Sequence, residues 1–254
     1  MGRDREKLTV IVPTFNEEKN IADCLESVGW ADEVLVVDSF STDSTVSICK
    51  SHGARILQHE YVNSAAQKNW ALPRAANRWV LIVDADERVS GELKEDVFSH
   101  LERGPELDGY WVRRRNVFMG RPVRFCGWQR DKVLRFFNRE AGRYEEKRVH
   151  AEVELRGRGG FLRGHLFHDS YTDFSSYLRK LDRYTDWGAQ DAAKRGVRFP
   201  VARLLFRPPA RFFRMYLLQL GFLDGVRGLV ICALAAMSVF VRYAKLWRLS
   251  LKQR

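Results

Sequence analysis

Two aspartates, Asp84 and Asp86, stand two residues apart directly after the apolar run Trp79–Val83. Such a run is typical of a strand buried on both faces of a sheet. Residues i and i+2 of an extended chain point the same way, so both carboxylates can face one Mg²⁺ or Mn²⁺ ion that bridges the phosphates of a ligand. An Asp-x-Asp sequence at a strand end also serves as a turn or a helix cap, so the motif alone does not decide between the two functions.

The chain before these aspartates alternates between strands and helices. Strands are predicted over residues 8–12, 34–37, 54–57 and 79–83, and helices around residues 21–28, 46–49 and 64–76. This alternation predicts right-handed crossovers and a mostly parallel sheet, in which ligands bind beyond the carboxyl ends of the strands. The loop after Val12, Asp38 and the Asp84/Asp86 pair all fall at that edge. The sequence therefore predicts an α/β fold with a polar ligand site there.

Several classes of protein do not fit this pattern. No G-x-G-x-x-G motif follows the first strand and no G-x-x-x-x-G-K-[ST] motif occurs, which argues against dinucleotide dehydrogenases and P-loop NTPases. The four cysteines form no C-x-x-C pair, which favours reduced thiols over a zinc site. The charged start of the chain runs straight into a strand, so no secretory signal is predicted. A hydrophobic content of 45% excludes a disordered chain.

The net charge of +11 is confined to the end of the chain. The last sixty residues hold twelve Lys and Arg against the single acid Asp224, and the residues before them are neutral overall. A neutral globular domain with a basic, aromatic tail points to an anionic membrane surface rather than to nucleic acid. We therefore expect a folded domain over residues 1–195 and a helical, membrane-associating tail over residues 196–254.

Two segments of the tail favour contact with a membrane. Residues Arg211–Leu218, which follow Pro208 and Pro209, have the pattern of a basic amphipathic helix that lies in a lipid interface. The uncharged run Gly228–Val241 spans about 21 Å as a helix, short of the roughly 30 Å hydrocarbon core of a bilayer. An interfacial or self-packed helical hairpin is therefore expected rather than a membrane span. An ordinary buried helix of the domain is the alternative.

Short motifs are spread along nearly the whole chain: Val10–Glu18, Val36–Thr45, Gln67–Asn69, Asp84–Glu87, Arg113–Asn116, Gly127–Trp128, Asp131–Arg135, Val149–His150 and Gly221–Gly225. Together they resemble the family 2 glycosyltransferases with the GT-A fold. The likeness is greatest to the branch that includes the lipopolysaccharide core β-1,4-glucosyltransferases. Phe40, where this branch usually has glycine, and Ala151, where it often has glutamate, are departures from the pattern.

The resemblance implies roles for individual residues. The nucleotide-sugar site would comprise Pro13, Thr14, Asn16, Glu17, Asp38, Gln67, Lys68 and Asp84. Asp86 would bind the divalent cation directly, and we add His150 as a further ligand, while His165 and His168 have weaker claims. Of the arginines between Tyr110 and Arg139, most are expected to face solvent, and Arg135 is expected to hold donor phosphate or an anionic acceptor.

Asp131 is the candidate catalytic base. Transfer of a sugar from a nucleoside diphosphate needs a carboxylate that takes the proton of the acceptor hydroxyl on the side opposite the leaving group, and such in-line attack inverts the anomeric configuration. The flanking cations Arg130 and Lys132 favour an ionised carboxylate. A surface ion pair with an arginine is the alternative for Asp131.

These inferences combine into one expected function. The chain is expected to be an inverting, metal-assisted glycosyltransferase that moves a hexose, glucose first, from a UDP-sugar to a lipid-linked or lipopolysaccharide-core acceptor. It would act as a peripheral or monotopic protein at the cytoplasmic face of the inner membrane. An aspartate-dependent phosphatase or nucleotidyltransferase is one alternative, and a membrane-associated binding or scaffold protein is another. Whether the chain forms a homodimer is left open by the sequence.

Overall fold

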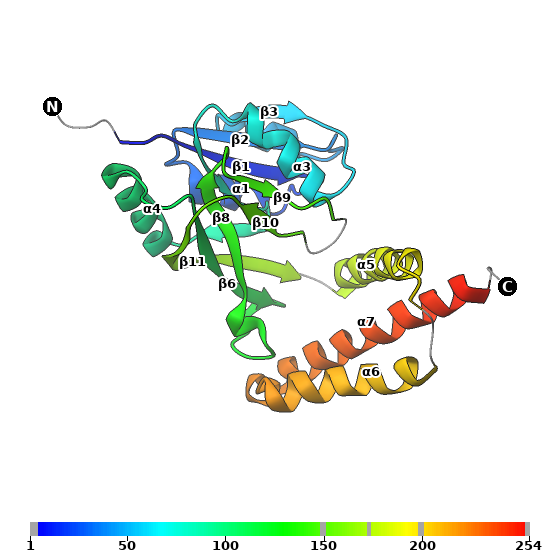
Figure 1. Ribbon diagram of the computed structural model, residues 1–254. Helices are drawn as coiled ribbons and strands as arrows, with labels where there is room; N and C mark the ends of the chain where they lie inside the picture. Colours follow the sequence, from blue (N-terminus) through cyan, green and yellow to red (C-terminus); the bar gives the residue numbers. More distant parts are fainter. Residues whose placement is uncertain (1–4, 148–150, 172–173, 198–200, 252–254) are drawn as a thin grey trace. The chain divides into compact units, whose positions relative to one another are not determined.

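The computed structural model describes residues 5–147, 151–171, 174–197 and 201–251, and the chain divides into two compact units (Figure 1). The first unit comprises Met1–Arg114 and Lys132–His168, and the second comprises Arg115–Asp131 and Asp169–Arg254. The predicted boundary after residue 195 is not tested by this division and stays a prediction.

A single large sheet forms the centre of the first unit. Its parallel part has the order β3-β2-β1-β4, with strands β1 Leu8–Thr14, β2 Glu33–Asp38, β3 Arg55–Gln58 and β4 Trp79–Ile82. Beyond β4 the order is β8-β6-β11-β5, with strands β8 Lys132–Asn138, β6 Gly109–Phe118, β11 Gly159–Tyr171 and β5 Glu87–Val89. Strand β8 runs antiparallel to both β4 and β6, and β5 runs antiparallel to β11. Strands β9 Gly142–Tyr144 and β10 Val153–Leu155 form a separate hairpin.

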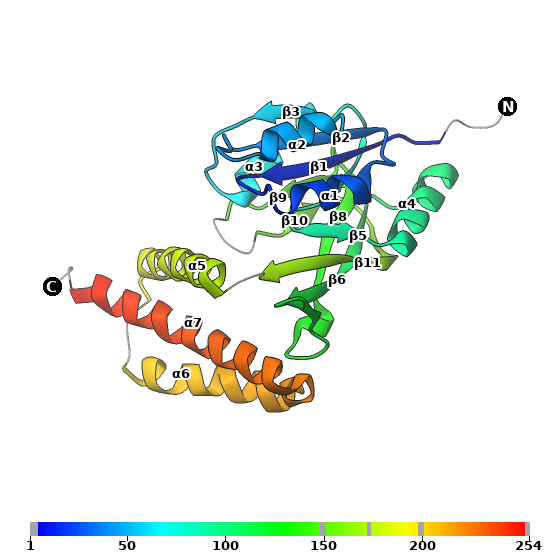
Figure 2. The same cartoon turned by 180° about the vertical axis from the view of Figure 1, so that it is seen from behind.

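Helices cover both faces of this sheet because its central strands are apolar on both sides. Val10 and Val12 of β1 pack in the core that contains α1 Ile21–Val28, α2 Thr45–Ser51 and α4 Gly91–Arg103. Ile11 points the other way, into the core that contains α3 Ser64–Ala71 and the hairpin β9-β10. Figure 2 shows α1 and α2 in front of the sheet, on the face opposite α3. The predicted α/β fold with a GT-A type sheet is confirmed.

Helix α3 ends earlier than the sequence pattern indicates. A helix is predicted to continue to Ala76, but α3 stops at Ala71 and a 3₁₀ turn, η1, follows over Leu72–Arg74. Pro73 explains the difference, because proline has no N–H group to donate to the preceding turn and its ring clashes with a continuing α-helix. The early end leaves Gln67 and Lys68 in the last turns of α3, where both side chains are buried.

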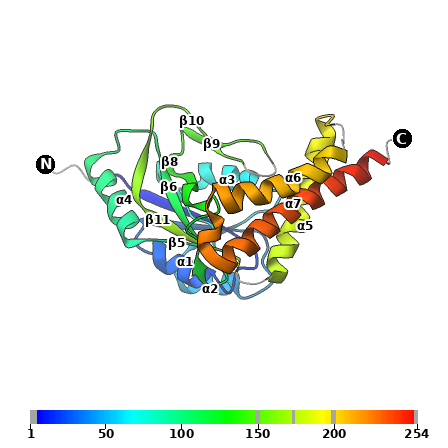
Figure 3. The same ribbon diagram turned by 90° about the horizontal axis from the view of Figure 1, so that it is seen from below.

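The second unit is mostly helical. It contains α5 Phe174–Lys194, α6 Val201–Phe213, the π turn η3 Arg214–Leu218, the 3₁₀ turn η4 Gly221–Asp224 and α7 Gly225–Leu251, together with β7 Arg121–Pro122 and the 3₁₀ turn η2 Trp128–Arg130. Helices α6 and α7 lie side by side in opposite directions, and α5 packs against α7 (Figure 3). The tail thus forms a helical hairpin. By length and composition alone, Gly221–Leu251 is long and apolar enough to cross a membrane.

Candidate active site

The strand register places the predicted polar segments at one edge of the sheet. Thr14 at the end of β1 pairs with Asp38 at the end of β2, and Ile11 pairs with Ile82, the last residue of β4. Asp84 follows two residues after Ile82, so it emerges at the same edge as Thr14 and Asp38. The carboxyl ends of the three parallel strands therefore form the wall of the site.

A cluster of buried charges lies just beyond β4. Lys68 Nζ is 2.7 Å from Asp84 Oδ1, and Arg135 Nη2 is 2.5 Å from Asp84 Oδ2. The same Arg135 nitrogen is 3.1 Å from Glu87 Oε1, and Arg135 Nη1 donates to Tyr144 Oη at 3.4 Å. The side chains of Arg135 and Lys68 are only 4–5% exposed. Helix α3, the β4–β5 loop and β8 thus contribute one charged group each to a single network.

This network keeps Asp84 ionised. Burial alone raises the pKa of a carboxyl group, but the charges of Arg135 and Lys68 outweigh it and hold the pKa of Asp84 far below its usual range. Burial lowers the pKa of Arg135, whereas Asp84 and Glu87 raise it well above its usual value. Because both oxygens of Asp84 already accept from cations, this aspartate orients Lys68 and Arg135 rather than offering a free oxygen to a ligand.

Glu87 also belongs to this network, although the sequence alone suggested no role for it. Its side chain is fully buried, and Oε2 accepts from the backbone N–H of Asp84 at 3.0 Å. Arg114 Nη1, from β6, lies 3.6 Å from Oε1 of Glu87. A buried carboxylate needs such partners, and Glu87 fixes the backbone turn between the two aspartates. Its position directly after the Asp-x-Asp motif is the sequence feature that could have identified Glu87 as part of the site.

Asp86 lies beside a histidine other than the one predicted to join it. His168 Nε2 of β11 is 3.6 Å from Asp86 Oδ2, because His168 pairs with Glu87 in the β5–β11 ladder. Burial lowers the pKa of His168, but the hydrogen bond and charge of Asp86 raise it above its usual value of 6.5. His150, the predicted metal ligand, falls outside the described residues. The described part of the chain contains no group of three or more His, Cys, Asp and Glu side chains that could hold a metal ion.

The loop after β2 forms a hydrogen-bonded cup around Asp38. Oδ1 accepts from the hydroxyl of Ser41 at 2.5 Å, and Oδ2 accepts from the backbone N–H of Ser41 at 3.1 Å and from Gln58 Nε2 at 3.2 Å. Asn16, from the loop after β1, accepts from the N–H of Thr42 at 2.8 Å. The backbone N–H of Glu17 donates to Thr45 Oγ1 at 2.8 Å. The loops after β1 and β2 are therefore tied together over the strand ends.

Two residues of this cup have left-handed backbone conformations. Asn16 has φ +53° and Phe40 has φ +60°, a region that glycine tolerates best and asparagine next. A glycine at the Phe40 position, which the resemblance led us to expect, would adopt this conformation without strain. The Phe40 side chain is 54% exposed, so it extends outward from the cup instead of filling the space around Asp38.

The remaining predicted donor-site residues differ in what their side chains do. The Gln67 side chain makes hydrogen bonds within the protein: its Nε2 donates to Ser39 Oγ at 2.9 Å, and its Oε1 lies 2.8 Å from His59 Nδ1. Thr14 Oγ1 is buried without a hydrogen-bond partner among the described residues. Pro13 is half-buried between the strand ends. Thr14 thus offers an unused hydroxyl at the sheet edge, whereas Gln67 holds the loops in place.

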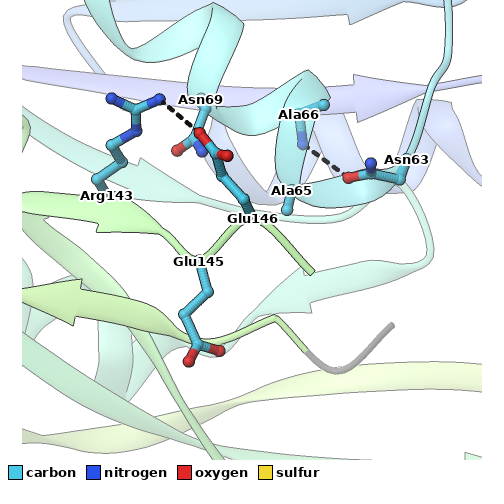
Figure 4. Close-up of a pocket in the computed structure, with 7 residues that line it drawn as sticks. All are labelled: Asn63, Ala65, Ala66, Asn69, Arg143, Glu145 and Glu146. Carbon is cyan, nitrogen blue, oxygen red and sulfur yellow. Dashed lines mark hydrogen bonds and ion pairs between the residues drawn. The ribbon is translucent and has the colours of Figure 1, made fainter. Parts of the chain in front are cut away.

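A polar hollow of about 460 Å³ lies next to α3 (Figure 4). It is lined by Asn63, Ala65, Ala66, Asn69, Arg143, Glu145 and Glu146. Arg143 precedes Tyr144 on β9, and successive residues of a strand point to opposite sides. Tyr144 contacts Arg135 of the charged network, and Asn69 of the hollow makes two hydrogen bonds of 2.9 Å to the Tyr144 backbone.

Asp131 belongs to the second unit, as the residue that ends η2. Its Oδ2 accepts from Asn116 Nδ2 at 2.8 Å. The amide holds one carboxylate oxygen in a fixed orientation without neutralising its charge. The two residues share the segment 115–131, so their pairing is a property of the second unit itself. The catalytic role of Asp131 stays a prediction.

Comparison with known proteins identifies related chains. Residues 9–183 match the family described as Glycosyl transferase family 2. The lipopolysaccharide core biosynthesis glycosyltransferase LpsC of Rhizobium meliloti is 28% identical over 93% of this chain and 93% of its own. An uncharacterized glycosyltransferase of Rickettsia typhi is 29% identical over 98% of this chain and 89% of its own. The crystal structure of TarS residues 1–349 from Staphylococcus aureus, in complex with UDP-GlcNAc, superposes with a TM-score of 0.52 at 16% identity, covering 97% and 92% of the two chains.

Proposed function

Because the chain belongs to glycosyl transferase family 2, we propose that it transfers a hexose, with glucose as the first candidate, from a UDP-sugar to a lipopolysaccharide-core or other lipid-linked acceptor. That the chain is a glycosyltransferase follows from the family and its relatives, which removes the phosphatase, nucleotidyltransferase and scaffold alternatives. The donor, the acceptor and the residue roles are the proposal. The main support for this proposal is that Lys68 and Arg135 both form ion pairs with Asp84 at the carboxyl edge of the sheet.

The donor site is assigned to the edge built by β1, β2 and β4. The cup around Asp38, with Asn16, Glu17 and the backbone around Pro13 and Thr14, would hold the nucleoside. Lys68 and Arg135 supply positive charge for the diphosphate, and Asp84 fixes both cations so that they need not reorganise when the donor binds. Gln67 is assigned a supporting role, since its side chain bonds Ser39 and His59.

We assign a divalent cation to Asp86, with His168 as a second candidate ligand. Carboxylate oxygens suit both Mn²⁺ and Mg²⁺, and Mg²⁺ is commonly held by one or two carboxylates together with substrate phosphates. A bound cation would neutralise the charge that develops on the leaving diphosphate. In this assignment His168 takes the place given to His150 from the sequence, because His168 lies 3.6 Å from Asp86.

The acceptor is assigned from the relationship to LpsC, which is named for lipopolysaccharide core biosynthesis. A lipid-linked acceptor places the enzyme at a membrane, at the cytoplasmic face of the inner membrane where nucleotide sugars are available. The long apolar helix α7 and the basic end of the chain support that location. We assign sugar transfer to the fold of residues 1–195 and membrane association to residues 196–254.

Replacing Asp131 by Asn is expected to lower sugar transfer by about 10²–10⁴-fold, because the amide cannot take the proton of the acceptor hydroxyl. The affinity for UDP should stay at the wild-type value. UDP release is measured with UDP-glucose, UDP-galactose and UDP-GlcNAc as donors and lipopolysaccharide-core glycolipid as acceptor. Asp186→Asn, which alters an exposed ion pair with Lys245, is the matched control. Transfer by the Asp131 variant at the control rate would remove Asp131 as the base.

A further inference from the structure

One face of the sheet in the first unit carries an exposed aromatic surface. Trp111 of β6 and Phe161 of β11 lie ring against ring, with their centroids 5.6 Å apart and their planes inclined by 32°. Leu162, the next residue on β11, packs in the core that contains α1, α2 and α4, so Phe161 points to the opposite side of the sheet. Phe161 is 57% exposed. An exposed phenyl ring supported by a tryptophan forms a flat apolar surface on which a sugar ring can stack.

Two cations lie beside these rings. Arg113 of β6 and Lys132 of β8 are direct partners in the antiparallel register of the two strands. Arg113 stands two residues after Trp111, and residues two apart on a strand point to the same side, so the arginine shares the face of the rings. Lys132 Nζ lies 4.9 Å from the centroid of the Phe161 ring. We call Trp111, Phe161, Arg113 and Lys132 together the Arg113 patch.

The positive charge of this patch is not balanced by an acid within the described residues. Arg113 and Lys132 are both exposed, and neither forms an ion pair in the part of the chain that the structure describes. Like charges that face each other on neighbouring strands destabilise a sheet. An anion between the two side chains would remove this repulsion. Arginine binds the oxygens of a phosphate or a carboxylate with two parallel hydrogen bonds, and lysine adds a point charge.

The patch lies at the edge of the sheet that is assigned to sugar transfer. Leu81, near the end of β4, pairs with Phe136 of β8. Because β8 runs antiparallel to β4, Lys132 at the start of β8 lies beyond the carboxyl end of β4. Lys132 also directly follows Asp131, the candidate base, in the chain. The donor phosphates are assigned to the cations that bind Asp84, so the patch is placed for the acceptor.

We propose that the Arg113 patch is an acceptor subsite for an anionic sugar, that is, a sugar that carries a phosphate or a carboxylate group. The sugar ring stacks on Phe161, and its anionic group lies between Arg113 and Lys132. Aromatic side chains with a few polar groups in fixed positions are the usual lining of a ligand site. This inference rests on the proposed function, because it names the chemical class of the acceptor.

Binding of three monosaccharides to the full chain tests the subsite directly. Glucose 6-phosphate, glucuronate and neutral glucose are titrated by NMR with Mn²⁺ and saturating UDP present, because UDP keeps the sugar phosphate out of the donor site. At least one anionic sugar should bind about tenfold more tightly than glucose, and comparison of the two identifies the recognised group as phosphate or carboxylate. The absence of any preference for an anionic sugar would overturn the proposal.

Charge variants show whether the patch is the source of this preference. Arg113→Gln and Lys132→Gln should each weaken binding of the anionic sugar about tenfold and leave binding of glucose unchanged. Arg103→Gln and Lys94→Gln are the matched controls, since they remove the same charges from exposed positions of α4, on the opposite face of the sheet. Variants of the patch that bind the anionic sugar as tightly as these controls would overturn the proposal.

Two further measurements separate binding from a structural role. Replacing Arg113 or Lys132 relieves the repulsion between them, so the free energy of unfolding should equal or exceed that of the wild type. Phe161→Leu should weaken binding of the charged and the neutral sugars alike, whereas Phe161→Tyr retains the ring and should bind both at the wild-type level. A loss of binding that follows a loss of stability would overturn the proposal.

The transfer assay distinguishes failure of this inference from failure of the proposed function. With core glycolipid as acceptor, Arg113→Gln should raise the KM for the acceptor about tenfold, while kcat and the affinity for UDP stay at the wild-type values. Removing the phosphates or reducing the carboxylates of the glycolipid should raise the wild-type KM and leave that of the variant unchanged. If the protein neither binds UDP nor transfers sugar, the proposed function fails, and the monosaccharide titrations still decide on the subsite.

Discussion

Replacing Arg135 by Met is expected to lower the free energy of unfolding by about 3–5 kcal/mol, because it leaves the buried carboxylate of Glu87 and the partly exposed carboxylate of Asp84 without their shared cation. Arg135 is 4% exposed and contacts both acids within 3.1 Å. Lys68 still forms an ion pair with one oxygen of Asp84, whereas the cation left beside Glu87 is the more distant Arg114. Urea denaturation followed by circular dichroism measures the change.

Arg55→Met is the matched control for this experiment. Arg55 also forms an ion pair, 2.8 Å from Glu33, but its side chain is 49% exposed. Exposed pairs contribute about 0–1 kcal/mol, so this variant should stay close to the wild type. Arg135→Lys retains the charge without the forked geometry and should fall between the two. If Arg135→Met cost no more than Arg55→Met, the network would not be the structural centre of the site.

Replacing Asp86 by Ala is expected to reduce sugar transfer by about three orders of magnitude. A divalent cation contributes several kcal/mol of transition-state stabilisation, and each 1.36 kcal/mol corresponds to a factor of ten in rate. The fold should persist, since Asp86 lies outside the network of Asp84, Glu87 and Arg135. UDP affinity in Mn²⁺ should fall to the value measured in EDTA, with transfer and calorimetry as the two readouts.

Asp23→Ala serves as the control for Asp86→Ala, because the Asp23 side chain is 74% exposed and its ion pair, with Arg88 at 3.5 Å, is long. His168→Ala should reproduce part of the loss in metal-dependent affinity. An Asp86→Ala enzyme that still binds UDP more tightly in Mn²⁺ than in EDTA, and still transfers at the Asp23→Ala rate, would rule out the metal role of Asp86.

The parallel half of the sheet and the polar edge were predictable from the sequence because they depend on local patterns. Short apolar runs that stop at Pro13, Asp38 or Asp84 mark buried strands, and parallel strands bring their ends to one edge. The order of β8, β6, β11 and β5 depends on pairings between distant segments, which alternation of apolar and polar residues does not specify.

The same distinction separates the residues of the charged network that the sequence indicated from the neighbouring histidine that it did not. Asp84, Asp86 and Lys68 stand in short motifs, and Arg135 follows from a basic window near a candidate base. His168 reaches Asp86 from 82 positions away, through the antiparallel register of β11 with β5. Nothing in the sequence near His168 sets it above the other histidines, so only the pairing of strands identifies it.

Calorimetric titration of the full chain with UDP in Mn²⁺, with GDP and with EDTA as controls, tests the central claim most directly. We expect UDP to bind in Mn²⁺, its binding to weaken strongly in EDTA, and GDP to bind less well because the proposed donor is a UDP-sugar. Failure of both nucleotides to bind, or equal binding of UDP with and without metal, would contradict the assignment of this edge of the sheet as a metal-assisted nucleotide-sugar site.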